Sequence, residues 1–453
     1  MKFTTKNIIK RSQMIMLLLI VFSASSCKKG YFYDSINDDP SQLQKPVPSN
    51  LLPGIILSTG YEWGGDASRF TSNFMQQTVG VANQSVLASN YQVSPDDVDN
   101  MWTAGLYVGI MSNANSLITV ATASKQGHYV ALGKILMAVN LGLTTDLWGD
   151  VPYTQAFKGQ ANLQPQYDTQ ASIYAAIDQL LTDAITSLST SDGSPFQPGT
   201  DDILFQGNLP KWVRFAHSLK AKFYLHLSKK DVSNYAKVLT EVPLGFAAGE
   251  SASVKFAGSS VTSENPWYQF NTQRGDIGFT GTIYDKLNAA NDPRLAVYQS
   301  LDDDGNASLG DLFGSPNSSV VVMSYDELKF IEAEAQLKGA TNPAAAATAY
   351  NAGVTANLLR TVTDVSYAAT VAKTGANITL NDIMTQKYFA LFLSPEVWTD
   401  WRRTGLPVLI ASPSGVLNGA LPRSLLYPSG EQRYNSNAPK NTTLLRRVFW
   451  DVQ

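Results

Sequence analysis

The segment SYDELKFIEAEAQLKGATNPAAAATAYNAGVTANLL, residues 324–359, decides the fold class of this chain. Ser324 and Glu327 have the spacing of a capping box, and an apolar stripe at three- and four-residue intervals follows them as far as Gly339. An Asn-Pro pair then starts a second, alanine-rich helical pattern. The segment therefore predicts two helices joined by a short turn.

Helical hairpins of this length are typical of tetratricopeptide-type (TPR-type) packing. Helical spacing recurs outward from this hairpin, most clearly over residues 97–121, 129–147, 172–188 and 211–227. No strict repeat at the TPR period is present, so TPR-like packing is expected rather than a TPR array. The predicted fold is mainly α, a scaffold of TPR-like helical hairpins with a loop-rich ligand-binding half. Minor β structure is expected within residues 241–271, and residues 412–441 are expected to be loops.

The composition excludes several classes of function. Only 16% of the 453 residues are charged and 44% are apolar, so the chain can bury a large core and is not of the disordered type. The formal net charge is −3, and it becomes more negative when the cationic first 26 residues are left out. A body this acidic has no electrostatic basis for binding nucleic acid. The single cysteine excludes an internal disulfide and a thiolate metal site.

The N-terminal sequence has the pattern of an export signal. A cationic segment precedes an apolar run at 14–22, and small residues occupy 23–26. This run is too short to span a bilayer as a helix. Cys27, the only cysteine, comes next in a context that resembles a bacterial lipobox. We therefore expect a signal peptide over 1–26, an outer-membrane lipid anchor on Cys27 and a polar tether over 27–48.

The remaining motifs predict no cofactor and no metal site. His128, His217 and His226 are not paired at metal-binding spacing, and ordinary helix histidines are expected. The sequence contains no dinucleotide fingerprint and no nucleophile elbow. The acidic run Asp302 to Asn306 departs from the EF-hand pattern. A solvated turn is expected there, and a loose calcium site is the alternative.

The segment DLWGDVPY, residues 146–153, places Asp146 and Asp150 four residues apart. Two carboxylates about 5 to 9 Å apart are what a glycoside hydrolase requires. Gly149 and Pro152 instead favour a helix that ends in a tight turn, where aspartates accept hydrogen bonds from the backbone. The turn is the favoured interpretation, and hydrolysis is the alternative.

The same segment, followed by Ala156, resembles the pattern D-x-W-G-D-x-P-Y-x-x-A of SusD-like nutrient-binding lipoproteins. Further stretches agree in chain order: NDDP (37–40), NPWY (265–268), NDPRL (291–295), MSYDE (323–327) with EAEA (332–335), WTDWRRTG (398–405) with Pro407, and LYP (426–428) with Glu431. Each stretch is short, but their combination is specific. The resemblance covers nearly all of residues 27–453, which we interpret as one SusD-like nutrient-binding domain.

The resemblance implies a mostly helical fold with four TPR-like units and an irregular ligand half. It implies a lipid-anchored protein of the outer membrane, exposed at the cell surface. Such a protein captures oligo- or polysaccharide and delivers it to a SusC-like TonB-dependent barrel transporter. The family does not cut its ligand, so neither catalysis nor a cofactor is expected. A peptide-binding member of the same uptake system and a secreted glycoside hydrolase on a helical scaffold are the alternative functions.

No binding residue transfers from the family by motif, so the candidates follow from chemistry. Sugars present C–H faces to aromatic rings and hydroxyl groups to polar side chains. Trp267, Tyr268 and Arg274 form the densest cluster of suitable side chains, in what is expected to be a loop. Trp63 and Tyr91 are the next candidates. Burial in the core is the alternative for each ring, and for Trp267 this alternative is a structural plug against the scaffold.

Overall fold

The computed structural model describes residues 46–452. The predicted signal peptide (1–26), Cys27 and most of the tether (27–48) lie outside the described residues. The NDDP stretch (37–40) lies outside them as well.

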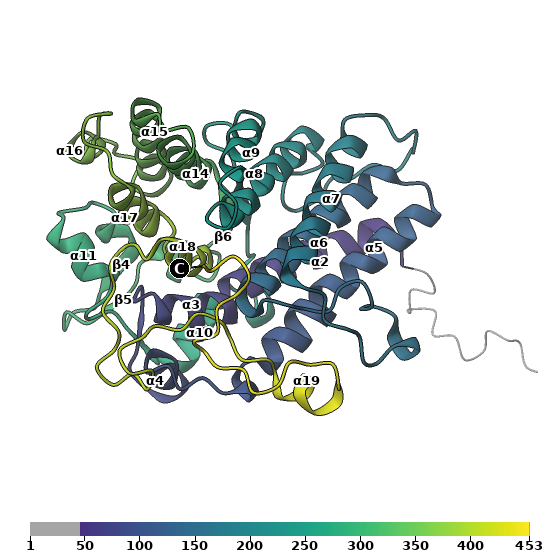
Figure 1. Ribbon diagram of the computed structural model, residues 1–453, viewed down its shortest axis with the longest axis horizontal. Coiled ribbons are helices and arrows are strands. Elements are labelled where there is room, and N and C mark those ends of the chain that lie inside the picture. Colours follow the sequence, from purple (N-terminus) through teal and green to yellow (C-terminus); the bar gives the residue numbers. More distant parts are fainter. Residues whose placement is uncertain (1–45, 453) are drawn as a thin grey trace, which may run out of the picture. The chain divides into compact units, whose positions relative to one another are not determined.

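Helices dominate the described chain, which confirms the predicted mainly α fold (Figure 1). The longer helices are α2 (Pro48–Gly64), α3 (Asp66–Phe74), α5 (Ser112–Ala123), α6 (Gly127–Trp148), α7 (Gln170–Leu188), α8 (Leu209–Leu227), α9 (Asn234–Glu241), α10 (Pro266–Arg274), α14 (Tyr325–Lys338), α15 (Pro343–Thr361), α17 (Leu380–Ala390) and α18 (Glu396–Thr404). The shorter α-helices are α4 (Asn83–Ser89), α11 (Ile283–Ala289), α12 (Leu295–Tyr298), α13 (Asp311–Gly314), α16 (Ala368–Val371) and α19 (Ser429–Tyr434).

Helices that follow one another along the chain form the scaffold. Each packs against the next in the order α5, α6, α7, α8, α9, α14 and α15, although a long insertion separates α9 from α14 in sequence. A second, smaller apolar cluster lies between α14, α15 and α17. In Figure 1, α3, α4 and α10 lie below this row of helices, together with the C-terminal loops. The C-terminal loops and these three helices therefore lie on one side of the helical row.

The hairpin of α14 and α15 forms as predicted, but the Glu327 carboxylate has a different partner from the one expected. Ser324 accepts a hydrogen bond from the backbone N–H of Glu327 (3.3 Å), which caps α14. The Glu327 carboxylate does not complete the capping box, because it pairs with Nζ of buried Lys222 at 2.7 Å. Asn342 caps α15 by accepting from the backbone N–H of Ala345 (3.1 Å). The expected local contact is thus replaced by an ion pair to α8.

The helix α6 is buried within the scaffold. Its length and hydropathy would suit a membrane span, yet 89% of its most apolar window is covered by the surrounding protein. The side-chain NH2 group of Asn140 is satisfied internally, donating to the Thr59 hydroxyl (2.9 Å) and to the Leu136 carbonyl (2.8 Å). The helix ends at Gly149, whose φ of +86° lies in a region that favours glycine. In this structure α6 is a core helix.

Strands are few in the described chain and form two-stranded antiparallel sheets. They pair as β1 (Val79–Gly80) with β3 (Ile277–Gly278), β2 (Ser251–Val254) with β6 (Val320–Ser324), and β4 (Gln299–Leu301) with β5 (Ala307–Leu309). Strand β2 confirms the β structure expected within residues 241–271. Residues 412–441 are loop-rich as predicted, with α19 as their only α-helix.

Two local structures differ from the sequence prediction. Residues 266–274 were expected to be a loop and form α10 instead, because Pro266 occupies its first turn and Asn265 caps it. The Asn265 side-chain oxygen accepts from the backbone N–H groups of Trp267 (2.8 Å) and Tyr268 (3.1 Å). Within the predicted helix 97–121, residues Met101–Met111 form a π-helix, η2, a winding that often occurs near functional sites.

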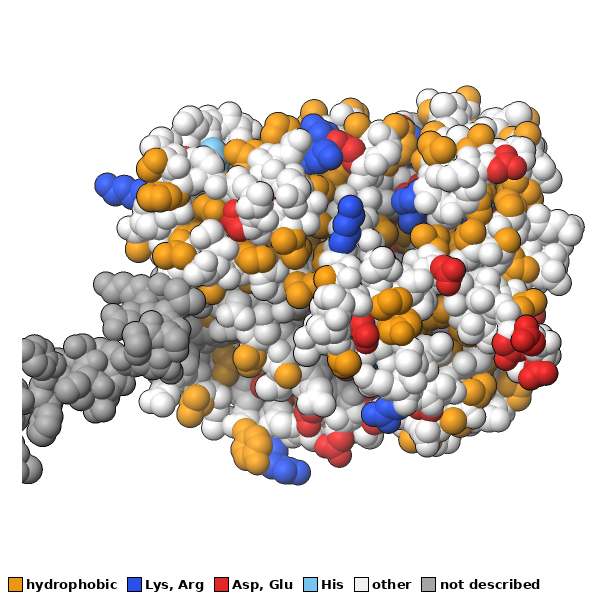
Figure 2. Space-filling model, turned by 180° about the vertical axis from the view of Figure 1, so that it is seen from behind, with side chains coloured by type: hydrophobic (Ala, Val, Ile, Leu, Met, Phe, Trp, Pro, Cys, Tyr) orange, Lys and Arg blue, Asp and Glu red, His pale blue; other side chains and the backbone are white. Residues whose placement is uncertain are grey.

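The surface is poor in charge. On the face shown in Figure 2, few charged side chains stand among neutral and scattered hydrophobic ones, as expected from a chain with 16% charged residues. The most exposed large hydrophobic side chains include Val408 and Ile410, at 73% and 84% exposure, in the loop after α18.

Candidate functional site

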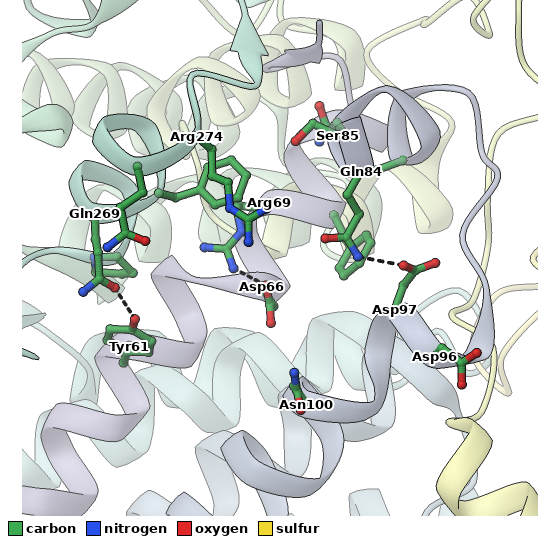
Figure 3. A pocket seen from close by; sticks show the side chains of 16 residues that line it. Tyr61, Asp66, Arg69, Gln84, Ser85, Asp96, Asp97, Asn100, Gln269 and Arg274 are labelled. Carbon is green, nitrogen blue, oxygen red and sulfur yellow. Dashed lines mark hydrogen bonds and ion pairs between the residues drawn. The ribbon is translucent and has the colours of Figure 1, made fainter. Parts of the chain in front are cut away.

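A pocket of about 330 Å³ opens where α3, α4 and α10 face one another (Figure 3). Helix α3 contributes Asp66, Arg69, Phe70 and Asn73, helix α4 contributes Gln84, Ser85 and Ala88, and helix α10 contributes Gln269, Phe270, Gln273 and Arg274. These positions recur at three- and four-residue spacing, so each helix presents one face to the pocket. Tyr61 of α2, Pro266, and the segment with Asp96, Asp97 and Asn100 complete the wall.

Arg69 is held in a fixed position inside the pocket. Its guanidinium group forms an ion pair with Asp66, one turn earlier on α3. It also lies over the ring of Phe270, 4.5 Å from the ring centroid. One face of Phe270 is therefore covered by a cation, and this ring is not an open stacking platform.

The opposite wall holds a fixed carboxylate. Asp97 accepts hydrogen bonds from the backbone N–H (2.8 Å) and hydroxyl (2.7 Å) of Ser94, and from the side-chain amide of Gln84 (2.7 Å). Burial raises the pKa of Asp97, but these hydrogen bonds outweigh it and leave the pKa below its ordinary value. Asp97 is therefore ionised at neutral pH.

Tyr61 supplies the exposed aromatic surface of the pocket. Its side chain is 39% exposed, and its hydroxyl donates a hydrogen bond to the side-chain oxygen of Gln269 on α10. Burial of the hydroxyl end raises the pKa of Tyr61 above its ordinary value. The ring is thus oriented by a polar contact at its far end, with part of its face open to solvent.

The three predicted site residues on α10 do not share one face of the helix. Arg274 lines the pocket, and Figure 3 shows its side chain beside that of Arg69. Trp267 lies in the core at 2% exposure, and its indole N–H donates to the Ser68 hydroxyl (2.9 Å). The exposed ring expected at Trp267 is absent, because α10 turns this residue toward α3. Tyr268 is half-buried and is not part of the pocket wall.

Trp63 and Tyr91 also lie outside this pocket. Trp63 is 5% exposed, and Nζ of Lys222 lies 5.4 Å from its ring centroid. Tyr91 is 2% exposed and lines a different cavity. Both rings are therefore buried, which is the alternative that the sequence left open for each.

Asp146 and Asp150 both accept hydrogen bonds that hold parts of the fold together. Asp146 is buried and accepts hydrogen bonds from the Tyr174 hydroxyl and from the indole N–H of Trp450 (3.0 Å). Asp150 accepts from the backbone N–H of Gln170 (2.7 Å), at the start of α7. This arrangement agrees with the helix-and-turn interpretation of the segment.

The acidic run Asp302 to Asn306 forms the turn between β4 and β5. Asp302 accepts from the backbone N–H groups of Asn306 (2.7 Å) and Asp304 (3.0 Å), and from the Asn306 side-chain amide (2.9 Å). Its oxygens are directed to its own turn. Within residues 46–452, no group of three or more His, Cys, Asp or Glu side chains is placed to hold a metal ion.

Sequence reasoning found the neighbourhood of the pocket but missed most of its residues. The candidates Trp63 and Trp267 are near the pocket residues Tyr61 and Gln269 in the chain, but neither candidate lines the pocket. The missed signal is the Asn265-Pro266 pair, which is typical of a helix start. Helical spacing from Pro266 would have placed Gln269, Phe270 and Arg274 on one face and Trp267 on another.

Comparison with known proteins identifies the family. A family model described as "Starch-binding associating with outer membrane" matches residues 40–428. The chain belongs to the SusD-like family. No curated protein matches the chain.

Solved structures of SusD-like proteins share the fold. A SusD/RagB family protein from Bacteroides thetaiotaomicron is 24% identical with a TM-score of 0.74, covering 90% of this chain and 99% of that one. A chitin-binding SusD homologue from Flavobacterium johnsoniae is 21% identical with a TM-score of 0.76, covering 89% and 98%. A further protein named as chitin-binding is 21% identical with a TM-score of 0.78, covering 90% and 100%. At these identities the likeness establishes the fold.

Proposed function

We propose that this SusD-like protein captures glycan at the outer-membrane surface without cutting it. We propose further that it delivers the glycan to a SusC-like TonB-dependent barrel transporter. The family description, starch-binding and associated with the outer membrane, supports glycan capture. Two structural neighbours named as chitin-binding support the same class of ligand. Delivery to a barrel is proposed from the resemblance of the sequence motifs.

The observation that carries glycan binding is the composition of the pocket between α3, α4 and α10. It combines the partly exposed Tyr61 ring with the paired amide and carboxylate groups of Gln84 and Asp97. A sugar hydroxyl can donate to a carboxylate while its neighbour accepts from an amide, and the C–H face of the sugar can cover the ring. Arg69 and Arg274 add further donors. These groups match the two kinds of surface that a sugar presents.

We assign no catalytic residue to the pocket. Asp66 is paired with Arg69, and Asp97 is held by Ser94 and Gln84. Asp96 is thus the one carboxylate of the wall without a side-chain partner among the described residues, whereas glycoside hydrolysis uses a pair of acids. Asp146, which the sequence offered as a possible catalytic acid, is buried and accepts a hydrogen bond from Trp450. A binding role without hydrolysis is the function that these contacts favour.

Replacing Tyr61 by alanine tests glycan binding at this pocket. Loss of a stacked ring should weaken binding by about 1 kcal/mol, or about fivefold, with little change in melting temperature. The measurement is isothermal titration calorimetry with α-glucan and chitin oligosaccharides that bind the unaltered protein. Tyr434→Ala is the matched control, because Tyr434 is 71% exposed and lies outside the pocket.

Equal affinities of the unaltered protein and Tyr61→Ala would contradict the pocket assignment. If the unaltered protein binds no oligosaccharide but binds peptides from a matched panel, glycan capture is the wrong function.

The anchor and the transporter are tested on cells. Cys27→Ala should move the protein from the membrane to the soluble fraction, because acyl chains no longer hold it. In mild detergent, the unaltered protein should be recovered together with a much larger barrel protein. Unchanged fractionation of the variant would refute acylation at Cys27, and recovery of the chain alone beside a co-expressed barrel would refute the partnership.

A further inference from the structure

A second cavity, of about 450 Å³, lies at the C-terminal ends of α3 and α4. Asn73 lines both cavities. The walls of the second one come from the ends of α3 and α4, from residues 280–286, and from residues 408–413 after α18. Its volume is in the range of small-molecule sites.

The wall formed by residues 408–413 is tied down by side chains of the opposite wall. The Tyr91 hydroxyl accepts a hydrogen bond from the backbone N–H of Ser412 (3.0 Å), and the Ser412 hydroxyl donates to the Asn90 side-chain oxygen (3.2 Å). Gln76 donates its amide to the Ile410 carbonyl. Gln76 and Tyr91 both have left-handed backbone, with φ of +56° and +62°, which costs free energy for residues other than glycine. The tertiary contacts therefore hold this cavity in a defined form.

Among the described residues that line the cavity, Lys286 is the only one with a charged side chain. It is half-buried, and it makes no ion pair or hydrogen bond through its side chain with any residue in 46–452. The neighbouring carboxylate of Asp285 is used elsewhere, accepting from the backbone N–H of Gly281 (2.6 Å). The ammonium group of Lys286 therefore has no counter-charge among the described residues, which makes it a suitable partner for an anion.

The rest of the lining is amphipathic. The exposed Thr280 and the half-buried Asn90 contribute polar side chains, and Val408 and Ile410 contribute aliphatic surface. The Thr78 and Ser89 hydroxyl groups are buried and donate to the Asn73 side chain. A sugar ring presents hydroxyl groups and C–H groups on different sides, so it matches such walls. A neutral sugar would leave the ammonium group of Lys286 without a partner, whereas a sugar carboxylate would supply one.

We propose that this cavity binds an acidic sugar, a uronate, whose carboxylate pairs with Nζ of Lys286. The uronate is either a free monosaccharide or one unit of a longer glycan. This site does not depend on glycan binding at the pocket of Tyr61 and Arg274.

The test is calorimetric titration of the full mature chain with glucuronate, galacturonate and glucose. We expect saturable binding of a uronate and much weaker binding of glucose. Lys286→Gln should weaken uronate binding about tenfold, since it removes a charge-assisted hydrogen bond, and Lys286→Arg should retain most of it. Lys158→Gln, which removes an exposed lysine outside both cavities, should bind as the unaltered chain does. A uronate-containing oligosaccharide that binds more tightly than the free uronate would identify the glycan unit as the source.

The proposal would be overturned by the absence of saturable uronate binding or by equal binding of glucose and uronate. Unchanged uronate binding by a folded Lys286→Gln would overturn it as well. Loss of uronate binding in Tyr61→Ala but not in Lys286→Gln would also overturn it, since the anion would then lie in the first pocket. Because neutral oligosaccharides report on the first pocket and uronate on the second, the two proposals fail separately.

Discussion

At the scale of one residue, Glu62 is the chain neighbour of the pocket residue Tyr61 and carries a buried carboxyl oxygen. Its carboxyl group packs against Gly105 of the π-helix η2, where a β-carbon would come within 2.2 Å of the carboxyl carbon. One carboxyl oxygen, Oε2, is buried with no hydrogen-bond partner in the described chain. Burial, followed by the negative charge of Asp66, raises the pKa of Glu62 to about 8. The folded protein therefore carries this carboxyl in its neutral form at pH 7.

Glu62 should make the protein less stable as the pH rises. Its folded pKa is above the ordinary value of 4.5, so the folded state keeps a proton that the unfolded state releases between pH 4.5 and pH 8. Stability should fall through that window. Glu62→Gln should remove this dependence, and its stability relative to the unaltered chain should rise by about 3 to 4 kcal/mol from pH 5 to pH 8. Urea denaturation at both pH values measures the difference.

Asp303→Asn is the control for this experiment, because it removes an exposed carboxyl group in the turn between β4 and β5. A Glu62→Gln variant whose stability relative to the unaltered protein is the same at both pH values would show that Glu62 titrates normally.

At the scale of one element, α10 joins the core to the pocket. Its first turn is fixed by Asn265, which also donates its side-chain amide to the Ser318 carbonyl (3.0 Å). One face then buries Trp267 against Ser68 of α3, and another presents Gln269 and Arg274 to the pocket. Trp267 therefore anchors α10 through its buried face, while the pocket side chains lie on another face of the same helix.

Trp267→Ala should lower the free energy of unfolding by about 3 to 5 kcal/mol, because it leaves a cavity and removes the indole N–H that donates to the Ser68 hydroxyl. Chemical denaturation measures this loss. Trp267→Phe should lose less, since most of the apolar surface remains. The remaining folded Trp267→Ala protein should bind oligosaccharide within a few-fold of the unaltered protein. A large loss of affinity with an unchanged melting temperature would instead make Trp267 a ligand-binding residue, as first predicted.

At the scale of the whole described chain, buried ion pairs join helices that are distant in sequence. His226 of α8 lies 2.8 Å from Glu396 of α18 and 3.2 Å from Asp146 of α6. Burial alone would lower the pKa of His226, but these two carboxylates raise it to about 9. Since the folded pKa exceeds 6.5, this contribution to stability is present below pH 6.5 and is lost as the pH rises through 9.

Arg403 of α18 connects the C-terminal part to the hairpin of α14 and α15. Its guanidinium group binds both carboxylate oxygens of Glu334 (2.8 and 2.9 Å) and one of Asp400 (2.7 Å), all buried. Arg403→Met should destabilise the fold by about 3 to 5 kcal/mol, because the buried Glu334 carboxylate loses its partner, while Asp400 keeps its ion pair with Lys387 (2.7 Å). The double variant Arg403→Met with Glu334→Leu should recover part of that loss. Guanidinium denaturation of the single and double variants measures the coupling.

Arg447→Met provides the matched control. Arg447 is partly exposed and pairs with Asp451, which is also bound by Arg423, so about 1 kcal/mol or less should be lost. Equal losses for Arg403→Met and Arg447→Met would mean that burial does not strengthen the Arg403 contacts.

The sequence by itself determined the helices and the family. The local signals of helix starts, such as Ser324 before α14 and Asn342 before α15, act between residues close in the chain, so they can be read without the fold. The same holds for the motifs that resemble SusD-like proteins, which the family match over 40–428 confirms.

Only the tertiary structure decided which side chains meet. The pocket joins residues of α2, α3, α4 and α10, separated by up to about two hundred positions, and the Lys222 to Glu327 ion pair displaced a contact that the local pattern predicted. The sequence could rank Trp267 as a ring but could not tell which face of α10 would be buried. Which face is buried depends on the packing of α10 against α3, because burial of the indole ring lowers the free energy of the folded state.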